Sequence, residues 1–276
     1  MTVLARFPVE ATLLAGASVR AEALAHGVAR LVLDRPRVRN AFNTPMVQEL
    51  IRALEVLAAR PGDRLLLLEG QGGVFCAGAD LATMREQATA GAERNLEEAR
   101  ELGRMFRLLA GFPLPVLGYV QGAAIGGGLG LAACCDFVLA DPSAVFATPE
   151  VTLGLVPAVI SPYLVRRLGL AHAAPLMLSG RRIEAPEALA MGLVQRLVPA
   201  GESGAEALSR VLREFLRAGP RAARATRELM LRLAPLPGPE LCEITAGAIA
   251  SARVSSEGQA GLQAFFLKAA TPWQAP

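Results

Sequence analysis

Lysine, histidine and aromatic residues are scarce in this chain of 276 residues. Lys268 is the one lysine among 28 basic residues, and His26 and His172 are the two histidines. The basic residues form no block and are not interleaved with the aromatic residues, which make up 5% of the chain, so nucleic-acid binding is not supported. Neither histidine has a partner residue in a motif beside it, so neither a zinc site nor a Ser-His-Asp triad is indicated.

The four cysteines have no spacing typical of a metal site. They are Cys76, Cys134, Cys135 and Cys242, and in a chain expected to be cytoplasmic they are most simply reduced, mostly buried thiols. Cys76 could act as a nucleophile, but no histidine stands in a motif with it, so packing is the favoured interpretation. We therefore expect no metal ion and no redox cofactor.

Charge is absent from residues 112–135, a stretch long enough to suggest a membrane span. Pro113, Pro115 and six glycines interrupt it and argue against a span. The first residues, MTVLARFPVEATLLAG, contain Glu10 and no long apolar run, so they lack the pattern of a signal peptide. With 53% hydrophobic and 19% charged residues, the chain is typical of a soluble enzyme with a large core, and we expect a cytoplasmic protein without membrane contact.

Glycine, in contrast, is concentrated where charge is missing. Gly126, Gly127 and Gly128 follow a strand-like segment at 116–120 and precede a helix-like one at 129–135. The start of a helix has unpaired N–H groups and a partial positive charge, which suits a phosphate, a carboxylate or a developing oxyanion. Close packing of a helix on a sheet would also favour glycine, and the match to a dinucleotide-binding turn is weak.

A second glycine-containing loop follows another predicted strand, residues 65–68. Its sequence is EGQGGVFCAGADL, in which glycines again mark a strand end ahead of a helical stretch. Two such loops can direct two backbone N–H groups at one oxygen atom, which packing alone does not require. The pair of loops therefore favours a binding or catalytic function.

The segments GVFCAGADL, QGAAIGGGLGLAACCD and LDRPRVRNAFN resemble signatures of the enoyl-CoA hydratase/isomerase (crotonase) superfamily, and the resemblance extends from about Gly27 to Trp273. It implies an α/β fold, a crotonase-like spiral of repeated β-β-α turns with a C-terminal helical module. It also implies an acyl-CoA thioester substrate, a homotrimer or hexamer, and no cofactor besides the coenzyme A of the substrate.

The resemblance further implies which residues form the site. The oxyanion hole is expected to consist of the backbone amides of Ala79 and Gly127, and Glu150 is expected to handle the proton. Relatives with two catalytic glutamates have the first where this chain has Gly130. The residues expected to bind substrate or coenzyme A are Ala77, Asp80, Leu81, Gly126, Phe265 and Lys268. A carboxylate in an apolar pocket has a raised pKa, which suits proton exchange near neutral pH.

With one glutamate instead of two, more than one reaction is compatible with the sequence. The segment GLVPAVISPYLVRRLG resembles methylglutaconyl-CoA and isohexenylglutaconyl-CoA hydratases, which favours hydration of an α,β-unsaturated acyl-CoA with a branched or glutaconyl-type acyl group. The alternatives are a Δ3-Δ2 enoyl-CoA isomerase and a non-catalytic CoA-binding homologue. Leu81, Met84 and the helical stretch 90–109 are expected to line the acyl pocket, but they do not identify the acyl group.

The pattern along the chain predicts three parts, an N-terminal extension at 1–16, a core at 17–199 and a helical module at 200–276. The resemblance implies that the core is the spiral with the active site and that the helical module serves oligomerisation and CoA contact. Within the core, a hairpin is expected to turn at His26-Gly27, and Thr44 is expected to be the N-cap of a helix. The helix is expected at 44–57, and further strands of the core are expected at 65–68, 116–120 and 137–140.

Overall fold

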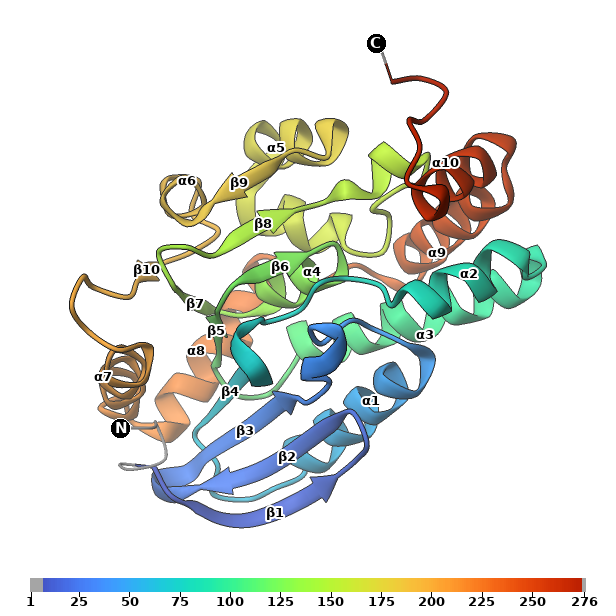
Figure 1. The fold of residues 1–276 in the computed structure, drawn as a ribbon. Coiled ribbons are helices and arrows are strands. Elements are labelled where there is room, and N and C mark those ends of the chain that lie inside the picture. Colours follow the sequence, from blue (N-terminus) through green and yellow to red (C-terminus); the bar gives the residue numbers. More distant parts are fainter. Residues whose placement is uncertain (1–6, 275–276) are drawn as a thin grey trace.

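The computed structural model describes residues 7–274, and this part of the chain forms two β-sheets surrounded by α-helices (Figure 1). The strands are β1 (Val9–Ala15), β2 (Val19–Leu24), β3 (Val28–Leu33), β4 (Leu65–Gly70), β5 (Val116–Val120), β6 (Ala123–Ile125), β7 (Phe137–Ala140), β8 (Val145–Ala147), β9 (Arg182–Glu184) and β10 (Arg196–Leu197). The helices are α1 (Thr44–Ala58), α2 (Leu81–Thr89), α3 (Ala92–Ala110), α4 (Gly127–Cys134), α5 (Ser161–Ser179), α6 (Ala185–Ala190), α7 (Gly204–Leu216), α8 (Pro220–Leu233), α9 (Pro239–Val254) and α10 (Ser256–Leu267).

The larger sheet has the strand order β1-β2-β3-β4-β5-β7-β10, and β6, β8 and β9 form a smaller sheet. β1, β2 and β3 are antiparallel neighbours, whereas the pairs from β3 to β10 are parallel. Parallel neighbours need long crossover connections, and α1, α3 and α4 lie in the first three of these. The predicted α/β class is confirmed, and the three predicted strands are β4, β5 and β7.

The larger sheet is covered on both faces, as the leucines of β4 show. Leu66 and Leu68 belong to the main core, which contains α1 and α3, while Leu65 and Leu67 belong to a second core on the other face. Helix α7 closes this second core with Ala207, Leu208, Val211 and Leu212. The first helix of the predicted C-terminal module thus packs on the sheet of its own chain.

The edge strand β1 lies inside the segment predicted as an N-terminal extension. It pairs antiparallel with β2, from Val9 opposite Leu24 to Ala15 opposite Arg20, with two irregularities of register. This pairing satisfies backbone groups that a free arm would leave to water. Residues 9–15 of the predicted extension are therefore an edge strand of the sheet, and residues 1–6 lie outside the described part of the chain.

The predicted hairpin is confirmed, but the predicted helix cap is wrong by one residue. β2 and β3 pair antiparallel through a short 3-10 turn in which His26 has φ 68°. Helix α1 begins at Thr44, and its N-cap is Asn43, whose Oδ1 accepts a hydrogen bond from the Met46 N–H at 3.0 Å. Asn43 has the extended backbone that a cap needs, with φ −127° and ψ 169°, whereas Thr44 is already helical.

Helices α8, α9 and α10 complete the C-terminal part of the fold (Figure 1). Buried Arg227 fixes α8 to the core, because it donates to Asp136 Oδ2 at 2.7 Å and to Ala110 O at 2.9 Å. Helix α9 packs against α3, and α10 packs against α9 and the 3-10 helix η5 (Pro149–Leu153). None of the helices within residues 7–274 is long and apolar enough to cross a membrane.

Candidate active site

The loop of residues 71–80, between β4 and α2, is joined to β6 by backbone hydrogen bonds. The N–H of Cys76 donates to Ala123 O at 2.9 Å, and the N–H of Ile125 donates to Cys76 O at 3.0 Å. Because β6 leads directly into the triple glycine, these bonds hold the two glycine loops side by side. The proximity that the sequence predicts for the two loops is confirmed.

The segment 34–43, which is the LDRPRVRNAFN motif without its first residue Leu33, holds the same loop from its other side. Asn40 is fully buried, and its Nδ2 donates to two carbonyl groups of the loop at 2.9 and 2.6 Å. The N–H of Phe42 donates to Gly78 O at 2.7 Å, and the N–H of Asp80 donates to Phe42 O at 2.7 Å. This motif therefore has a structural function, which is to fix the position of the loop.

Ala79 is left with a free backbone N–H in this arrangement. The amides of Ala77 and Asp80 both donate to carbonyl groups of segment 34–43, at 3.0 and 2.7 Å. Among residues 7–274, no protein acceptor takes the N–H of Ala79. Gly78, just before it, has φ 93°, a left-handed conformation that glycine adopts without strain. The amide predicted as the first oxyanion donor is thus available.

The triple glycine provides a second free amide at the start of α4. The N–H of Gly126 donates to Ala147 O at 2.8 Å, and Gly127 is the first helical residue. The first N–H groups of a helix have no partner inside it, and the N–H of Gly127 has none elsewhere in the described residues. The positive end of the helix dipole lies at the same place, which favours an anionic oxygen there.

Close packing also requires these glycines. A Cβ on Gly127 would lie 2.8 Å from Phe42 Cε2, and one on Gly128 would lie 2.5 Å from Cys76 O. Packed atoms do not tolerate such distances, so larger residues would separate the two loops. The packing interpretation and the binding interpretation of the glycines are therefore compatible, since close packing is what brings the two amides together.

The two free amides and Glu150 line one cavity of about 860 Å³, a volume within the usual range for ligand sites. We call the lining residues of the loop 71–80, the triple glycine and η5 the loop wall, and those of α3, α9 and α10 the helix wall. The predicted site residues that line the cavity are Ala77, Ala79, Leu81, Gly126, Gly127, Glu150 and Phe265. Met84 and α3 also line it, as the sequence predicts for the acyl pocket.

Glu150 presents a carboxylate beside the triple glycine. A Cβ on Gly126 would lie 2.7 Å from Glu150 Oε1, so the carboxylate is close to the residue that precedes the second free amide. Its Oε2 is buried and has no hydrogen-bond partner in residues 7–274. Burial raises the pKa of Glu150 from the ordinary 4.5 to about 7, as the sequence predicts for a carboxylate in an apolar pocket.

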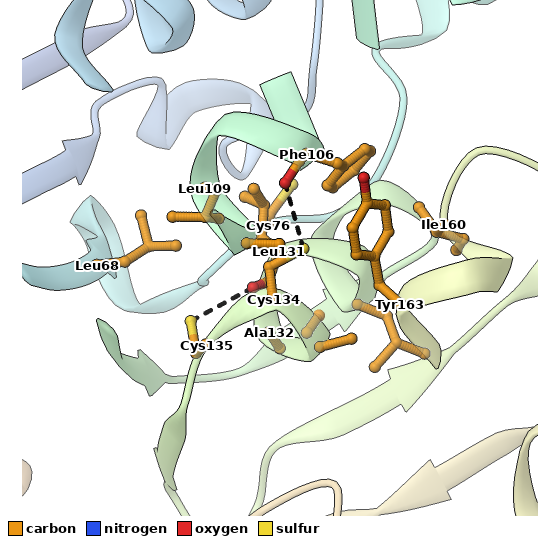
Figure 2. Packing of buried hydrophobic residues seen from close by; sticks show 14 of the residues in the cluster. Leu68, Cys76, Phe106, Leu109, Leu131, Ala132, Cys134, Cys135, Ile160 and Tyr163 are labelled. Atoms are coloured by element: carbon orange, nitrogen blue, oxygen red, sulfur yellow. Dashed lines mark hydrogen bonds between the residues drawn. The ribbon is translucent and has the colours of Figure 1, made fainter. Parts of the chain in front are cut away.

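Apolar side chains close the position at which two-glutamate relatives carry their first glutamate. Gly130 is buried in α4, and a Cβ there would lie 2.4 Å from Ile160 Cγ2 and 2.9 Å from Phe106 Cε1. Figure 2 shows Phe106, Ile160 and Tyr163 gathered in this part of the core. A second carboxylate cannot enter at this position unless its neighbours move.

Asp80 and Lys268, both predicted to bind substrate or coenzyme A, do not line the cavity. Asp80 Oδ1 accepts the N–H of Ala82 at 2.9 Å as the N-cap of α2, and Oδ2 forms an ion pair with Arg35 at 2.9 Å. The carboxylate of Asp80 therefore positions the loop rather than a ligand. Lys268 is exposed and ends α10 in a left-handed conformation, three residues after Phe265.

The cysteines in this region act as packing residues. Burial raises the pKa of Cys76 to about 12 and that of Cys135 also to about 12, so neither is a thiolate near neutral pH. Figure 2 shows the Sγ of Cys134 directed at Phe106 O and that of Cys135 at Leu131 O. Within the described residues, no group of three or more His, Cys, Asp or Glu side chains could hold a metal ion.

The helix wall contains charged residues that sequence reasoning did not single out. They are Arg94, Glu97, Glu98 and Glu101 on α3 and Arg253 on α9. The sequence predicts that α3 lines the pocket but gives its charges no function. No motif marks Arg253, because it reaches the site only through the packing of α9 on α3.

Comparison with known proteins places this architecture in a family. The family model for enoyl-CoA hydratase/isomerase matches residues 23–276. An enoyl-CoA isomerase/hydratase of Mycosarcoma maydis is 33% identical over 211 residues, which are 73% of this chain and 76% of that protein. The crystal structure of an enoyl-CoA hydratase from Shewanella pealeana has 38% identity and a TM-score of 0.74, and covers 93% of this chain and 96% of its own. The crystal structure of an enoyl-CoA hydratase from Mycobacterium avium has 30% identity and a TM-score of 0.81, and covers 94% of this chain and 100% of its own.

Proposed function

Because the chain belongs to the enoyl-CoA hydratase/isomerase family and has the crotonase fold, we propose that it adds water across the 2,3-double bond of an enoyl-CoA. One observation carries this proposal. The carboxylate of Glu150, whose Oε2 has no hydrogen-bond partner in residues 7–274, lies beside Gly126 in the same cavity as the free amides of Ala79 and Gly127. An acyl-CoA thioester is the substrate that the family implies.

The free amides of Ala79 and Gly127 bind the thioester oxygen in the proposed reaction. Charge develops on this oxygen when a nucleophile adds to C3, and donors fixed in advance stabilise that charge without rearrangement. Loss of one such donor typically costs ~3 kcal/mol of transition-state stabilisation. The backbone thus supplies much of the catalysis, and the hydrogen bonds that hold the loop 71–80 serve to keep its donor in place.

Glu150 moves the proton. In its ionised form it takes a proton from water while the water oxygen bonds to C3, and the electrons of the double bond move towards the thioester oxygen. The resulting enolate then takes that proton from Glu150 at C2, which restores the carboxylate. A pKa near neutrality lets one group both accept and donate a proton. No metal ion or redox cofactor enters these steps, and coenzyme A is part of the substrate.

We further propose a branched or glutaconyl-type acyl group. The segment that resembles such hydratases begins at Gly154, and its residues on the cavity are Leu155, Val156, Pro157, Ala158, Val159 and Ile160. Side chains at these positions contact whatever acyl group fills the cavity. The support for this choice is the local similarity of sequence together with the location of the segment.

A Δ3-Δ2 enoyl-CoA isomerase is the second candidate, and the closed position at Gly130 favours it. Isomerisation needs one base that moves a proton between C2 and C4, and Glu150 is the one carboxylate that the loop wall offers. Hydration by the same residue requires a water molecule beside it. The two reactions therefore differ in whether the cavity admits water next to Glu150.

An absorbance assay of the enoyl thioester separates these candidates. Purified enzyme is given crotonyl-CoA, 3-methylglutaconyl-CoA and a 3-enoyl-CoA of matched length in separate reactions. The proposal predicts loss of the 2-enoyl absorbance with the first two substrates. Appearance of that absorbance from the 3-enoyl-CoA, without hydration of either 2-enoyl substrate, would establish the isomerase instead. No turnover of any substrate would support a non-catalytic CoA-binding homologue.

We also propose that the enzyme is a cytoplasmic homotrimer or hexamer. The support for an oligomer is the apolar surface that the C-terminal helices leave exposed, formed by Leu229, Met230 and Leu233 of α8 and Leu241 and Ile244 of α9. Apolar patches of this kind commonly mark interfaces between proteins. Sedimentation of the purified chain, in which a mass of three or six copies is expected, tests this part of the proposal.

A further inference from the structure

Arg253 is a cavity-lining arginine in the last turn of α9. It lies one helical turn after Ile249, so the two side chains share a face of the helix, and both line the cavity. Leu102 of α3 and Leu262 of α10 line it as well. Arg253 therefore lines the cavity together with apolar side chains of the kind that surround an acyl chain.

Arg253 has one side-chain partner in the part of the chain that the structure describes. Within residues 7–274, its guanidinium makes one hydrogen bond, from Nη1 to Asn95 Oδ1 at 3.3 Å, and no carboxylate lies within 4.0 Å. Three arginines on α3, in contrast, form ion pairs with carboxylates: Arg94 with Glu98 at 3.3 Å, Arg100 with Glu243 at 2.8 Å and Arg104 with Glu55 at 2.7 Å. A guanidinium has five N–H donors, so most of the hydrogen-bonding capacity of Arg253 is unused. Burial disfavours its charged form and lowers the pKa of Arg253 to about 10.

Asn95 holds Arg253 in this position. The Asn95 side chain is fully buried, and its Nδ2 donates to the carbonyl oxygens of Gln87, Ala90 and Gly91 at 3.0, 3.1 and 3.3 Å. These three bonds at the α2–α3 junction fix the amide, which leaves Oδ1 for the guanidinium. The remaining donors of Arg253 are not sealed inside the protein, because none of its nitrogens is both buried and unpaired.

We propose that Arg253 binds a carboxylate at the far end of the acyl chain, and hence that the substrate is the CoA thioester of an unsaturated dicarboxylic acid. This inference rests on the proposed function. A planar guanidinium can bind both oxygens of a carboxylate at once, and a charge-assisted pair of this kind compensates for the burial of both groups. The free donors of Arg253 and the apolar surroundings meet that requirement.

The acidic residues of the helix wall restrict where such an anion can bind. Glu97, Glu98 and Glu101 line the cavity from α3. Glu98 already accepts hydrogen bonds from Gln87 at 2.8 Å and Arg94 at 3.3 Å, and it acts on Arg253 only from beyond ion-pair distance. A substrate carboxylate is therefore repelled by these three glutamates and attracted at Arg253. The same carboxylates disfavour the phosphates of coenzyme A at this position.

The test compares pairs of 2-enoyl-CoA substrates of five to eight carbons that differ only at the far end, a methyl group in one and a carboxylate in the other. Wild-type enzyme is expected to prefer the carboxylate at one or more lengths. The Arg253→Met variant replaces the guanidinium with an apolar chain of similar reach. It should lose about 30-fold in kcat/KM on the preferred carboxylate substrate and change by less than about threefold on its methyl partner.

Three outcomes would overturn the inference. Wild-type enzyme could prefer the methyl substrate at every length, Arg253→Met could weaken both partners equally, or Arg253→Lys could fail to recover any of the carboxylate preference. Equal weakening would assign Arg253 to coenzyme A or to the fold, and the melting temperature of each variant separates these two explanations. If no substrate is hydrated, the proposed function fails, and calorimetric binding of the saturated thioester pairs still tests Arg253 by the same comparison.

Discussion

The two walls of the cavity differ in the source of their chemistry. The loop wall offers backbone N–H groups and a single carboxylate, Glu150. Backbone hydrogen bonds to β6 and to the segment 34–43 hold the loop 71–80 in place. The helix wall offers charged side chains from α3 and α9. Groups that several backbone hydrogen bonds fix to a sheet keep their geometry, whereas substitution of a side chain on a helix surface has little effect on the fold.

This difference indicates a division of function within one cavity. The bond-making atoms of the substrate are expected at the loop wall, where donors to the thioester oxygen and the proton carrier converge. The variable end of the acyl group is expected at the helix wall, where Arg253 and its acidic neighbours lie. Mutations in the loop wall should therefore abolish turnover of every substrate, and mutations in the helix wall should change which substrate is used.

The largest expected effect is that of Glu150→Gln. General acid-base catalysis typically contributes ~100 to ~10,000-fold, so kcat for hydration should fall by that factor while the fold and the assembly remain. The comparison variant is Glu101→Gln, which alters a carboxylate of the same cavity on the helix wall and should keep hydration within about threefold. Equal losses in the two variants, or a loss of less than tenfold in Glu150→Gln, would show that proton transfer is not confined to the loop wall.

A slightly smaller loss is expected when one backbone donor is removed. Ala79→Pro deletes an N–H that no group within residues 7–274 accepts, so no hydrogen bond among these residues is lost with it. Removal of one oxyanion donor typically lowers kcat by ~100 to ~1,000-fold. Ala79→Ser retains the amide and should keep most of the activity. The idea is wrong if both variants fold and the proline variant still hydrates crotonyl-CoA as fast as the serine variant.

The raised pKa of Glu150 predicts opposite pH responses for activity and stability. As a base, Glu150 must be ionised in the free enzyme, so kcat/KM should increase with pH up to about 7 and then level off. Its folded-state pKa lies above the ordinary 4.5, so its contribution to stability is fully present below about 4.5 and is lost as pH rises through about 7. The loss is on the order of 3 kcal/mol for a shift of this size.

Urea unfolding of wild type and Glu150→Gln at pH 4.5 and pH 8 measures this contribution. The free energy of unfolding of wild type relative to the variant should decrease between the two pH values. A constant difference would mean that Glu150 titrates in the folded protein as it does in water.

The smallest expected effect concerns Lys268, outside both walls. Lys268→Ala should weaken binding of coenzyme A by at most about fivefold, since an exposed lysine gains little from one screened ion pair. Binding of the pantetheine analogue, which lacks the nucleotide phosphates, should not change. Calorimetry at low and high salt measures both ligands. Equal weakening of the two would show that Lys268 does not contact a phosphate.

Sequence reasoning succeeded where a local pattern determines the backbone. The glycine loops end parallel strands, and the need for close approach at Gly127 and Gly128 explains why no other residue stands there. Glu150, which the resemblance to the enoyl-CoA hydratase/isomerase superfamily implied as the proton carrier, is a buried carboxylate with a raised pKa. The hairpin at His26-Gly27 followed from turn chemistry alone.

Sequence reasoning failed where a residue's function depends on distant partners. The sequence did not predict β1, whose place in the fold depends on its pairing with β2. The carboxylate of Asp80 forms an ion pair with Arg35 and caps the start of α2, and no short motif indicates these contacts. Arg253 has no motif, because its position on the cavity results from the packing of α9 against α3. Such contacts join parts of the chain that no short pattern connects.

The central claim is that the backbone amides of the loop wall polarise the thioester, and the infrared stretch of that carbonyl reports it directly. Crotonyl-CoA labelled with carbon-13 at the carbonyl is bound to Glu150→Gln, which should hold it without turnover. The account predicts a carbonyl band at lower frequency than in water, and a partial return towards the water value when Ala79→Pro is added but not when Ala79→Ser is added. A band at the same frequency in the proline and serine backgrounds, with the ligand bound in both, would contradict the account.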